Sequence, residues 1–268
     1  MAEISSINVV GYLSATVAKN SSKTFSVALT DVANPTAPVA IDKLFSSMKN
    51  VSGAATWSDG GMDQIWTWRD NQWYKYGYQK TGGGRTGKPE AWAWMRCNYL
   101  GDKSLVALTE EDVVNPGETF LYKHCDNNSP AELTLSGQVR EFGSPVGYTI
   151  PKNSSQFIAL PWPVAFKLSD FTNLVTTVNV SGSATWSDGG MDQIWTWRNN
   201  QWYKYGYQKT GGGRTGKPEA WAWMRANYLT DKSLVALTDE DAVEAGEGFL
   251  YKHCDNNSPA IITFKPLQ

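Results

Sequence analysis

The segment that decides the fold is an aromatic stretch in the first half of the chain. It reads Asp63-Gln64-Ile65-Trp66-Thr67-Trp68-Arg69-Asp70-Asn71-Gln72-Trp73-Tyr74-Lys75-Tyr76-Gly77-Tyr78. On both sides of Asp70-Asn71, aromatic or β-branched residues recur with the period of two that is typical of β-strands. An Asp-Asn pair accommodates the positive φ angles of a tight hairpin turn. The sequence therefore predicts an antiparallel hairpin with strands at 63–69 and 72–78.

The register of this hairpin predicts two different faces. Pairing Trp68 with Trp73 and Trp66 with Lys75 places these four side chains on one face. The opposite face carries Ile65, Thr67, Tyr74, Tyr76 and Tyr78. Only one face of an antiparallel pair needs a core behind it, and the Ile/Tyr face is the more ordinary core candidate. We expect the tryptophan face to be an exposed platform, with Lys75 over one of its rings.

The chain repeats itself. Residues 56–96 recur as residues 185–225 with one difference in 41 positions, Asp70 against Asn199. The front of the unit repeats loosely, with Val10-Gly11-Tyr12 recurring as Val146-Gly147-Tyr148. Either structure or function requires the residues of this middle segment to stay constant, or the segment was recently copied again within the gene. We expect an all-β protein of two tandem units, 1–139 and 140–268, each a small antiparallel sandwich or barrel, related by approximate twofold symmetry.

Composition excludes several classes of protein. The net charge is -2 and no strongly basic stretch is present, so we expect no nucleic-acid partner. No apolar run is long enough to cross a bilayer. Cys125 and Cys254 are one position repeated, and Cys97 is replaced by Ala226 in the second copy. We therefore expect three unpaired thiols.

The first residues, Met1-Ala2-Glu3-Ile4, lack the basic and apolar regions of a signal peptide. They fit a cytosolic protein, or a mature exported chain that begins behind a new Met-Ala. We expect the second case, a secreted or cell-surface protein.

Two motifs suggest cofactors and are better explained without them. Gly82–Lys88 has the spacing of a phosphate-binding loop, but Pro89 stands where Ser or Thr would bind Mg²⁺. His124-Cys125 and its repeat His253-Cys254 are adjacent pairs, whose side chains point to opposite faces of a strand. We expect no metal and no cofactor.

Catalytic constellations are also weak. Asp59, Asp63 and Glu90 could supply the paired acids of a glycoside hydrolase, although nothing in the sequence sets their separation. The two histidines are one position repeated, so no Ser/His/Asp or Cys/His set is persuasive. We expect a protein that is not an enzyme.

Tryptophan is the strongest functional signal, because 12 of the 13 tryptophans lie in the two copies. They either build the core or form stacking surfaces for sugar rings, with polar neighbours that bind hydroxyl groups. The candidate ligand-binding residues of the first copy are Trp57, Asp59, Asp63, Gln64, Trp66, Trp68, Arg69, Trp73, Lys75, Arg85, Trp92 and Trp94. Those of the second copy are Trp186, Asp188, Asp192, Gln193, Trp195, Trp197, Arg198, Trp202, Lys204, Arg214, Trp221 and Trp223.

Several short motifs resemble a family of secreted bacterial repeat proteins of the Verrucomicrobia–Planctomycetes group. They are Asn8-Val9-Val10-Gly11-Tyr12, Gly61-Met62-Asp63-Gln64-Ile65-Trp66, Trp73-Tyr74-Lys75-Tyr76-Gly77-Tyr78, and 112–122 with its repeat Ala245-Gly246-Glu247-Gly248-Phe249-Leu250-Tyr251. The resemblance implies export and a β-rich fold, and it carries no activity or site. This chain differs from the pattern in its additional tryptophans, notably Trp66, and in the long loop at 82–88.

These observations lead to three hypotheses. The first is a non-catalytic, lectin-like or adhesive protein that binds a glycan through one tryptophan face in each repeat. The second is a structural surface protein that self-assembles, by packing the same face against another protein subunit, into fibres or a layer. The third is a glycoside hydrolase.

Overall fold

The computed structural model describes residues 10–27, 29–30, 37–69, 72–82, 89–98, 104–115, 117–126, 128–139, 145–198, 200–211, 218–226, 233–255 and 257–266. The predicted Asp70-Asn71 turn, Arg85 and Arg214 lie outside these residues.

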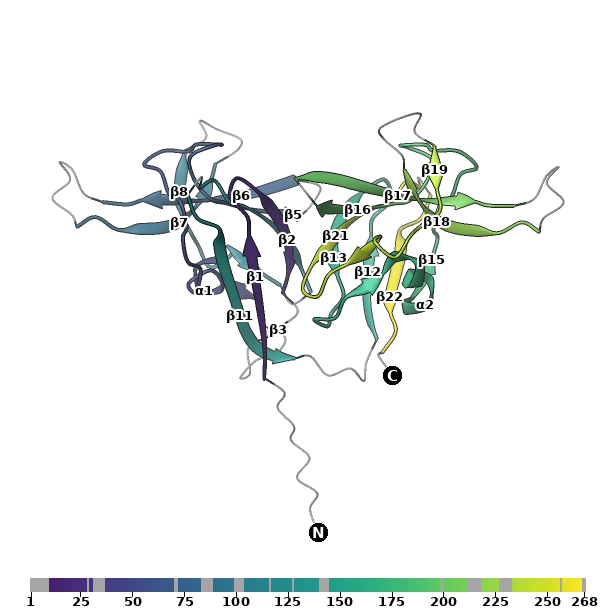
Figure 1. Ribbon diagram of the computed structural model, residues 1–268, viewed down its shortest axis with the longest axis horizontal. Helices are drawn as coiled ribbons and strands as arrows, with labels where there is room; N and C mark the ends of the chain where they lie inside the picture. The colour runs from purple at the N-terminus through teal and green to yellow at the C-terminus, as the bar shows by residue number, and fades with distance from the viewer. Residues whose placement is uncertain are drawn as a thin grey trace, which may run out of the picture.

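Strands dominate both halves of the chain, so the predicted all-β class is confirmed (Figure 1). The first half contains β1 (Val10–Val17), β2 (Ser22–Ser26), β3 (Leu29–Thr30), β4 (Val39–Ala40), α1 (Ile41–Leu44), β5 (Gln64–Arg69), β6 (Gln72–Lys80), β7 (Trp92–Cys97), β8 (Leu105–Ala107), β9 (Val113–Val114), β10 (Thr119–Lys123) and β11 (Ala131–Val139). The second half contains β12 (Val146–Ile150), β13 (Ser155–Ala159), β14 (Phe166–Lys167), the short 3-10 helix η2 (Leu168–Asp170), α2 (Phe171–Leu174), β15 (Val175–Val178), β16 (Gln193–Arg198), β17 (Gln201–Lys209), β18 (Trp221–Ala226), β19 (Leu234–Val235), β20 (Ala242–Val243), β21 (Gly248–Lys252) and β22 (Ala260–Phe264).

Each described sheet takes its strands from one half of the chain. The first half forms a six-stranded sheet in the order β2-β10-β5-β6-β7-β8, a three-stranded sheet β1-β11-β3 and the pair β4-β9. The second half forms β13-β21-β16-β17-β18-β19, β12-β22-β15 and β14-β20. The order of the large sheet is therefore the same in both halves.

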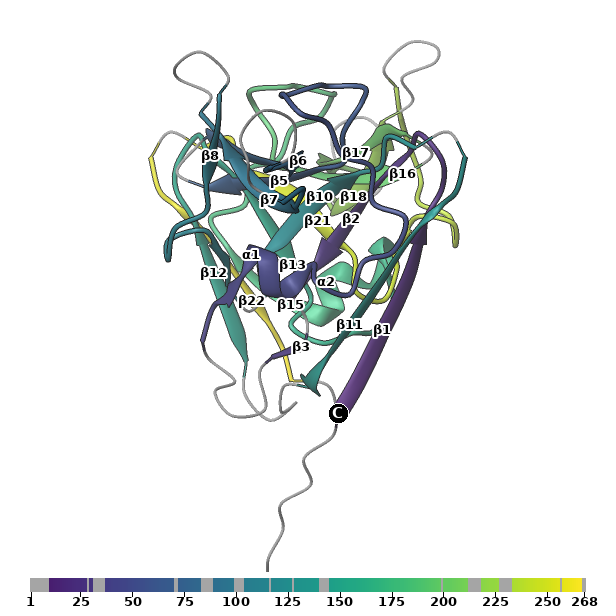
Figure 2. The same cartoon turned by 90° about the vertical axis from the view of Figure 1, so that its left-hand side faces the viewer.

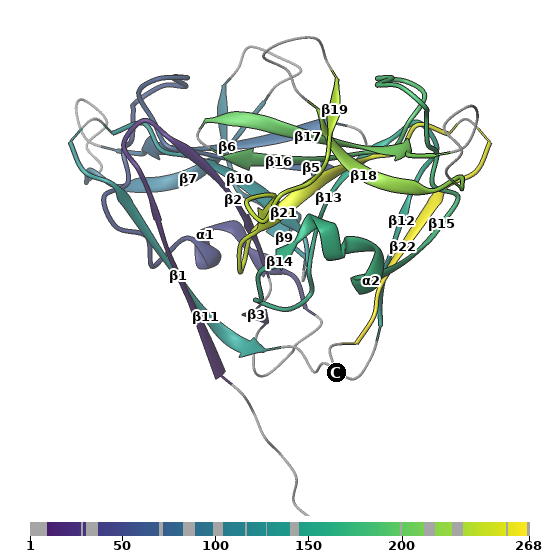
Figure 3. The ribbon, with the colours of Figure 1, turned by 45° about the vertical axis from the view of Figure 1, so that its right-hand side comes forward.

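The predicted hairpin is present as β5 and β6. Its register pairs Trp68 with Trp73 and Trp66 with Lys75, as the alternation predicts, and β16 pairs with β17 in the same way. The Ile/Tyr face lies in the core, where Ile65 and Tyr76 are completely buried. Behind this face lies α1, between the large and the small sheet (Figures 2 and 3). The interpretation of the Ile/Tyr face as core is thus confirmed.

The tryptophan face is not the open platform expected from the sequence. Trp66, Trp68 and Trp73 are half-buried, because the large sheet of the second half lies against them. The ring of Trp73 contacts Phe157 of β13 edge-on, with centroids 5.5 Å apart. Burial of apolar surface away from water stabilises a fold. Here the second half of the same chain buries the tryptophan face.

Reciprocal hydrogen bonds join the two large sheets. Trp68 Nε1 donates to the carbonyl oxygen of Ser155 at 2.6 Å, and its counterpart Trp197 Nε1 donates to that of Ser22 at 3.0 Å. Ser22 and Ser155 occupy the same place in the Lys-Asn-Ser-Ser motif of each half. Such mutual contacts are the pattern of an isologous interface, here formed within one chain.

Two further predictions are answered by the structure. Cys97, Cys125 and Cys254 are free thiols, as expected. No helix in the described part of the chain is long and apolar enough to span a membrane.

Candidate functional site

A pocket of about 500 Å³ opens where the two halves meet. Its residues come from both large sheets and from the loops beside them. They are Asn20, Ser22, Asp59, Gly60, Trp66, Trp73, Leu121, Lys123, His124, Cys125, Trp197, Asn200 and Trp202. We call it the interface pocket.

The indoles of the first half are held in place before any ligand arrives. Trp66 and Trp73 meet edge to face, with ring centroids 5.7 Å apart. The Trp66 Nε1 group donates to the side-chain oxygen of Gln64 at 2.9 Å. On the same ring lies Lys75, whose Nζ is 3.6 Å from the centroid. The predicted cation–π contact is therefore present, and it fixes Trp66 as one wall of the pocket.

The second half closes the pocket with Trp197, Trp202 and the turn between β16 and β17. Asn200 of this turn has a φ of 59°, a left-handed conformation that asparagine tolerates better than most residues. Its side-chain amide donates to the carbonyl oxygen of Asn20 at 3.1 Å and accepts from the backbone N–H of Ser22 at 2.9 Å. One turn residue thus ties the β16–β17 hairpin to the loop before β2.

The polar wall is formed by Asp59, Lys123 and Cys125. Lys123 Nζ donates to the carbonyl oxygen of Asp59, and the Cys125 thiol donates to the same oxygen at 3.8 Å. The Asp59 carboxylate accepts a hydrogen bond from Trp57 Nε1 at 3.1 Å. Burial raises the pKa of the Cys125 thiol, so this group is a weak nucleophile at neutral pH.

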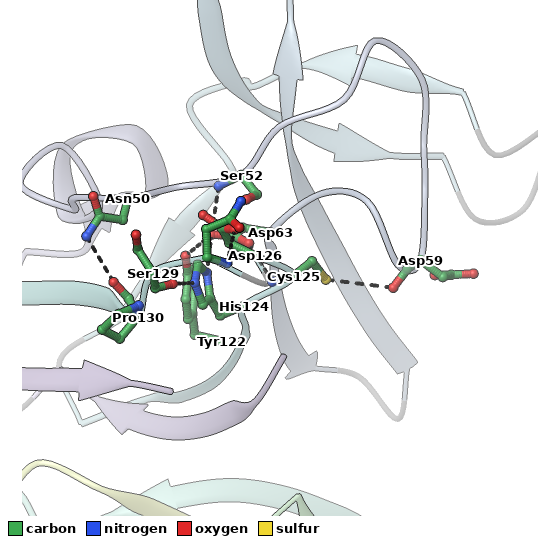
Figure 4. Close-up of polar contacts among 11 residues, drawn as sticks. Asn50, Ser52, Asp59, Asp63, Tyr122, His124, Cys125, Asp126, Ser129 and Pro130 are labelled. Atoms are coloured by element: carbon green, nitrogen blue, oxygen red, sulfur yellow. Dashed lines mark hydrogen bonds and ion pairs between the residues drawn. The ribbon is translucent and has the colours of Figure 1, made fainter. Parts of the chain in front are cut away.

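Behind this wall lies a buried network centred on Asp63 (Figure 4). One oxygen of its carboxylate accepts from the backbone N–H of Ser52 at 3.1 Å, from the Tyr122 hydroxyl and from His124 Nδ1 at 2.9 Å. The other accepts from the backbone N–H of Cys125 at 2.7 Å. Asp63 and the His124 side chain are fully buried. The pairing and hydrogen bonding are what a buried carboxylate requires.

Both ring nitrogens of His124 are occupied. Nε2 lies 2.8 Å from the carbonyl oxygen of Ser129, which can only accept, while Nδ1 faces Asp63. Neither ring nitrogen is therefore free to activate Cys125 or to bind a metal. No group of three or more potential metal ligands occurs in the described residues.

The second half repeats this network. Asp192 accepts from the Tyr251 hydroxyl at 2.7 Å, from His253 Nδ1 at 2.9 Å and from the backbone N–H of Cys254 at 2.9 Å. His253 Nε2 lies 2.8 Å from the carbonyl oxygen of Ser258. The Asp-His pairs are thus shared structural elements that tie the segment preceding β5 or β16 to the end of β10 or β21.

The structure sorts the predicted ligand-binding residues into four groups. Those that line the interface pocket are Asp59, Trp66, Trp73, Trp197 and Trp202. Those that are buried in the interior and do not line the interface pocket are Asp63, Gln64, Trp94, Asp192, Gln193 and Trp223. Those exposed at the start of β7 and β18 are Trp92 and Trp221. The remaining described residues, which are outside the lining of the interface pocket, are Trp57, Trp68, Arg69, Lys75, Trp186, Asp188, Trp195, Arg198 and Lys204.

Arg69 and Lys75 support the fold rather than a ligand. The Arg69 guanidinium forms an ion pair with Glu118, with an Nε to oxygen distance of 2.5 Å. Lys75 is nearly buried against Trp66. In the second half, Arg198 donates to the carbonyl oxygen of Glu240 at 2.6 Å, and Lys204 Nζ lies 3.8 Å from the Trp195 ring.

Sequence reasoning missed the pocket residues outside the 41-residue repeat. They are Asn20, Ser22, Leu121, Lys123, His124 and Cys125, and within the repeat the candidates also lack Gly60 and Asn200. The motifs at 19–22 and 122–125 contain most of these positions, and both motifs recur in the second half at 152–155 and 251–254. This recurrence is the sequence feature that could have identified them. Their proximity to the indoles depends on contacts between residues far apart in the sequence.

Comparisons with protein-family models, with curated proteins and with solved structures each gave no match. The family resemblance and the export it implies therefore stay predictions.

Proposed function

We propose that this chain is a non-catalytic, lectin-like protein that binds carbohydrate in the interface pocket. The observation that carries the proposal is the composition of the lining. Indole rings from both halves stand beside the side chains of Asn20, Asp59 and Lys123 in a space of about 500 Å³. This volume is in the usual range of small-molecule sites.

The chemistry of a sugar ring suits this lining. A pyranose presents apolar C–H faces that stack on an indole, and hydroxyl groups at its rim that donate and accept hydrogen bonds. Trp66 and Trp202 supply the aromatic surfaces, and Asp59 and Lys123 supply an acceptor and a donor. In this proposal both halves contribute to one site, rather than each half carrying a complete site.

Hydrolysis is the weaker candidate. Glycosidases use two carboxyl groups, about 5–10 Å apart, on either side of the scissile bond. Asp59 is the carboxylate among the described lining residues. Asp63 is buried within its own network, and Glu90 pairs with Lys80 near the end of the β6–β7 hairpin.

Assembly through the tryptophan face is also weaker, because the second half of the chain already covers that face. Trp68 and Trp73 contact Ser155 and Phe157, so a partner subunit would first have to separate the halves. We also propose that the protein is exported to the cell surface, as the family resemblance implies.

The test is a glycan array probed with the intact chain, followed by calorimetry with an oligosaccharide that binds. Trp202→Ala and Lys123→Met should each weaken binding about tenfold, which corresponds to about 1.4 kcal/mol. Ile261→Ala is the matched control, since this apolar residue is 39% exposed on β22 and lies outside the pocket lining. Near-UV circular dichroism of each variant checks the fold. An array without any bound glycan, or pocket variants with parental affinity, would overturn the proposal.

A further inference from the structure

Two tryptophans stand apart from the interface pocket. Trp92 is 41% exposed and Trp221 is 39% exposed, whereas the other tryptophans, all in the described part of the chain, are buried or half-buried. They begin β7 and β18, the second strands of the β6–β7 and β17–β18 hairpins. Figure 1 shows these hairpins extending toward opposite ends of the molecule.

Both exposed indoles are held rigidly from behind. Trp92 stacks on Tyr78, with centroids 5.8 Å apart and an interplanar angle of 16°. Its ring also lies against Gly53, where a Cβ would come within 2.2 Å of the six-membered ring. Trp221 repeats the arrangement, stacked on Tyr207 at 5.7 Å and 18°. An exposed indole fixed in this way loses little conformational entropy when a ligand binds.

A charged pair borders each indole. Lys80 is the ladder partner of Trp92 and forms an ion pair with Glu90 at 2.5 Å. The Glu90 carboxylate also accepts a hydrogen bond from Trp92. In the second half, Lys209 and Glu219 are paired at the same distance. Each indole is thus flanked by an acceptor and a donor that reach solvent.

In the first half, Trp92 also forms part of the wall of a cavity of about 390 Å³. Met48 and Met95 line its apolar side, and Asp42 and Ser46 of the α1 region supply polar groups. The exposed ring therefore continues into a hollow that extends the surface available to a ligand.

We propose that Trp92 and Trp221 are two further stacking sites, which bind pyranose rings of β-linked polysaccharides and allow one chain to bridge two polymers. The proposal rests on the carbohydrate class of the proposed function, but not on the interface pocket. Sugars with equatorial hydroxyl groups fit, because both faces of the ring then carry C–H groups and the hydroxyls point toward the charged pair.

The size and placement of these sites favour a polymer over a protein partner. One partly exposed indole is far smaller than the roughly 800 Å² that each partner contributes to a stable protein interface. A single sugar ring covers it. Two identical sites at opposite ends suit a ligand that offers the same unit many times, so that weak binding at each site adds up.

The first experiment uses the unmodified chain and limited oxidation by N-bromosuccinimide, with the modified tryptophans located by mass spectrometry. Trp92 and Trp221 should be oxidised first, because they are the most exposed indoles. Cellulose powder, chitin powder or soluble xylan should protect both when it binds. Binding of any of these polymers without protection of the two residues would overturn the proposal.

The second experiment separates the new sites from the interface pocket. In a Trp202→Ala background, the chain should still precipitate soluble xylan or adsorb to one of the powders. Adding Trp92→Ala should abolish precipitation but not adsorption, and adding Trp221→Ala as well should lower adsorption about tenfold. Phe substitutions at both positions keep a ring and should retain part of the binding.

The outcomes distinguish the two proposals. If pocket variants lose binding to short oligosaccharides while the Trp92→Ala/Trp221→Ala variant adsorbs to polymers like the parent, the further sites are refuted and the proposed function stands. If only the Trp92 and Trp221 variants lose binding, the pocket is refuted. A parent chain that binds none of the sugars or polymers overturns both.

Discussion

Thr119 and Gly248 occupy the same position in the two halves of the chain, and they contact each other. A Cβ on Gly248 would lie 1.9 Å from Thr119 Oγ1. The two halves therefore meet at equivalent positions of the repeat. A threonine at position 248 would clash with Thr119, which explains why the second copy carries glycine there.

Enlarging Gly248 should therefore separate the two halves. We expect Gly248→Ala to lower the free energy of unfolding by about 1–3 kcal/mol, the usual cost of overpacking. Urea denaturation followed by tryptophan fluorescence measures this loss. Gly189→Ala is the control, because nothing lies within 4 Å of a Cβ at that position. Equal effects of the two substitutions would contradict the close contact.

The buried Asp63–His124 pair should be essential for the stability of the first half. Asp63→Asn replaces one acceptor oxygen by an NH₂ group, so buried donors of Tyr122, His124 or Cys125 lose their acceptor, and each unsatisfied buried group costs about 1–3 kcal/mol. Asp192→Asn should have a similar effect in the second half. The exposed Asp59→Asn should change the free energy of unfolding by less than about 0.5 kcal/mol. An Asp63→Asn variant that unfolds at the parental urea concentration would refute the role of the network.

High pH should unfold the protein through its buried tyrosines. Burial raises the pKa of Tyr205 to about 12, and it raises the pKa values of Tyr76, Tyr122 and Tyr251 well above their ordinary value. Because tyrosine in an unfolded chain ionises near pH 10, the stabilisation is complete below pH 10. It is lost as the pH rises toward 12 and beyond.

Tyrosinate absorbance and near-UV circular dichroism, recorded together, check this pH dependence. The four buried tyrosines should ionise only as the circular dichroism signal disappears. Ionisation of all tyrosines near pH 10 in a folded protein would contradict the burial.

Cys125 should report on occupation of the interface pocket. Burial raises the pKa of its thiol, so the folded chain should react with a disulfide reagent at pH 8 more slowly than the unfolded chain. In a Cys97→Ala/Cys254→Ala variant, Cys125 is the remaining thiol. A pocket ligand should slow its reaction further, because Cys125 lines the pocket. A reaction rate unaffected by a bound sugar would place that sugar elsewhere.

The hairpin and its two faces are predictable from the local alternation of residues. The alternation at 63–78 specified strands β5 and β6, their register and the burial of Ile65 and Tyr76. A one-residue shift would have exchanged the two faces, so a pattern of period two carries this information locally. The all-β class and the free thiols also followed from the residues alone.

What covers the tryptophan face depends on how the two halves of the chain pack together. The alternation of residues shows that Trp68 and Trp73 share a face, but it does not show which part of the protein packs against that face. The contacts with Ser155 and Phe157 join positions more than 80 residues apart, and the pairing of Asp63 with His124 spans 61 residues. Such contacts depend on how the two halves and their sheets pack. The interface pocket exists only because the two halves pack against each other.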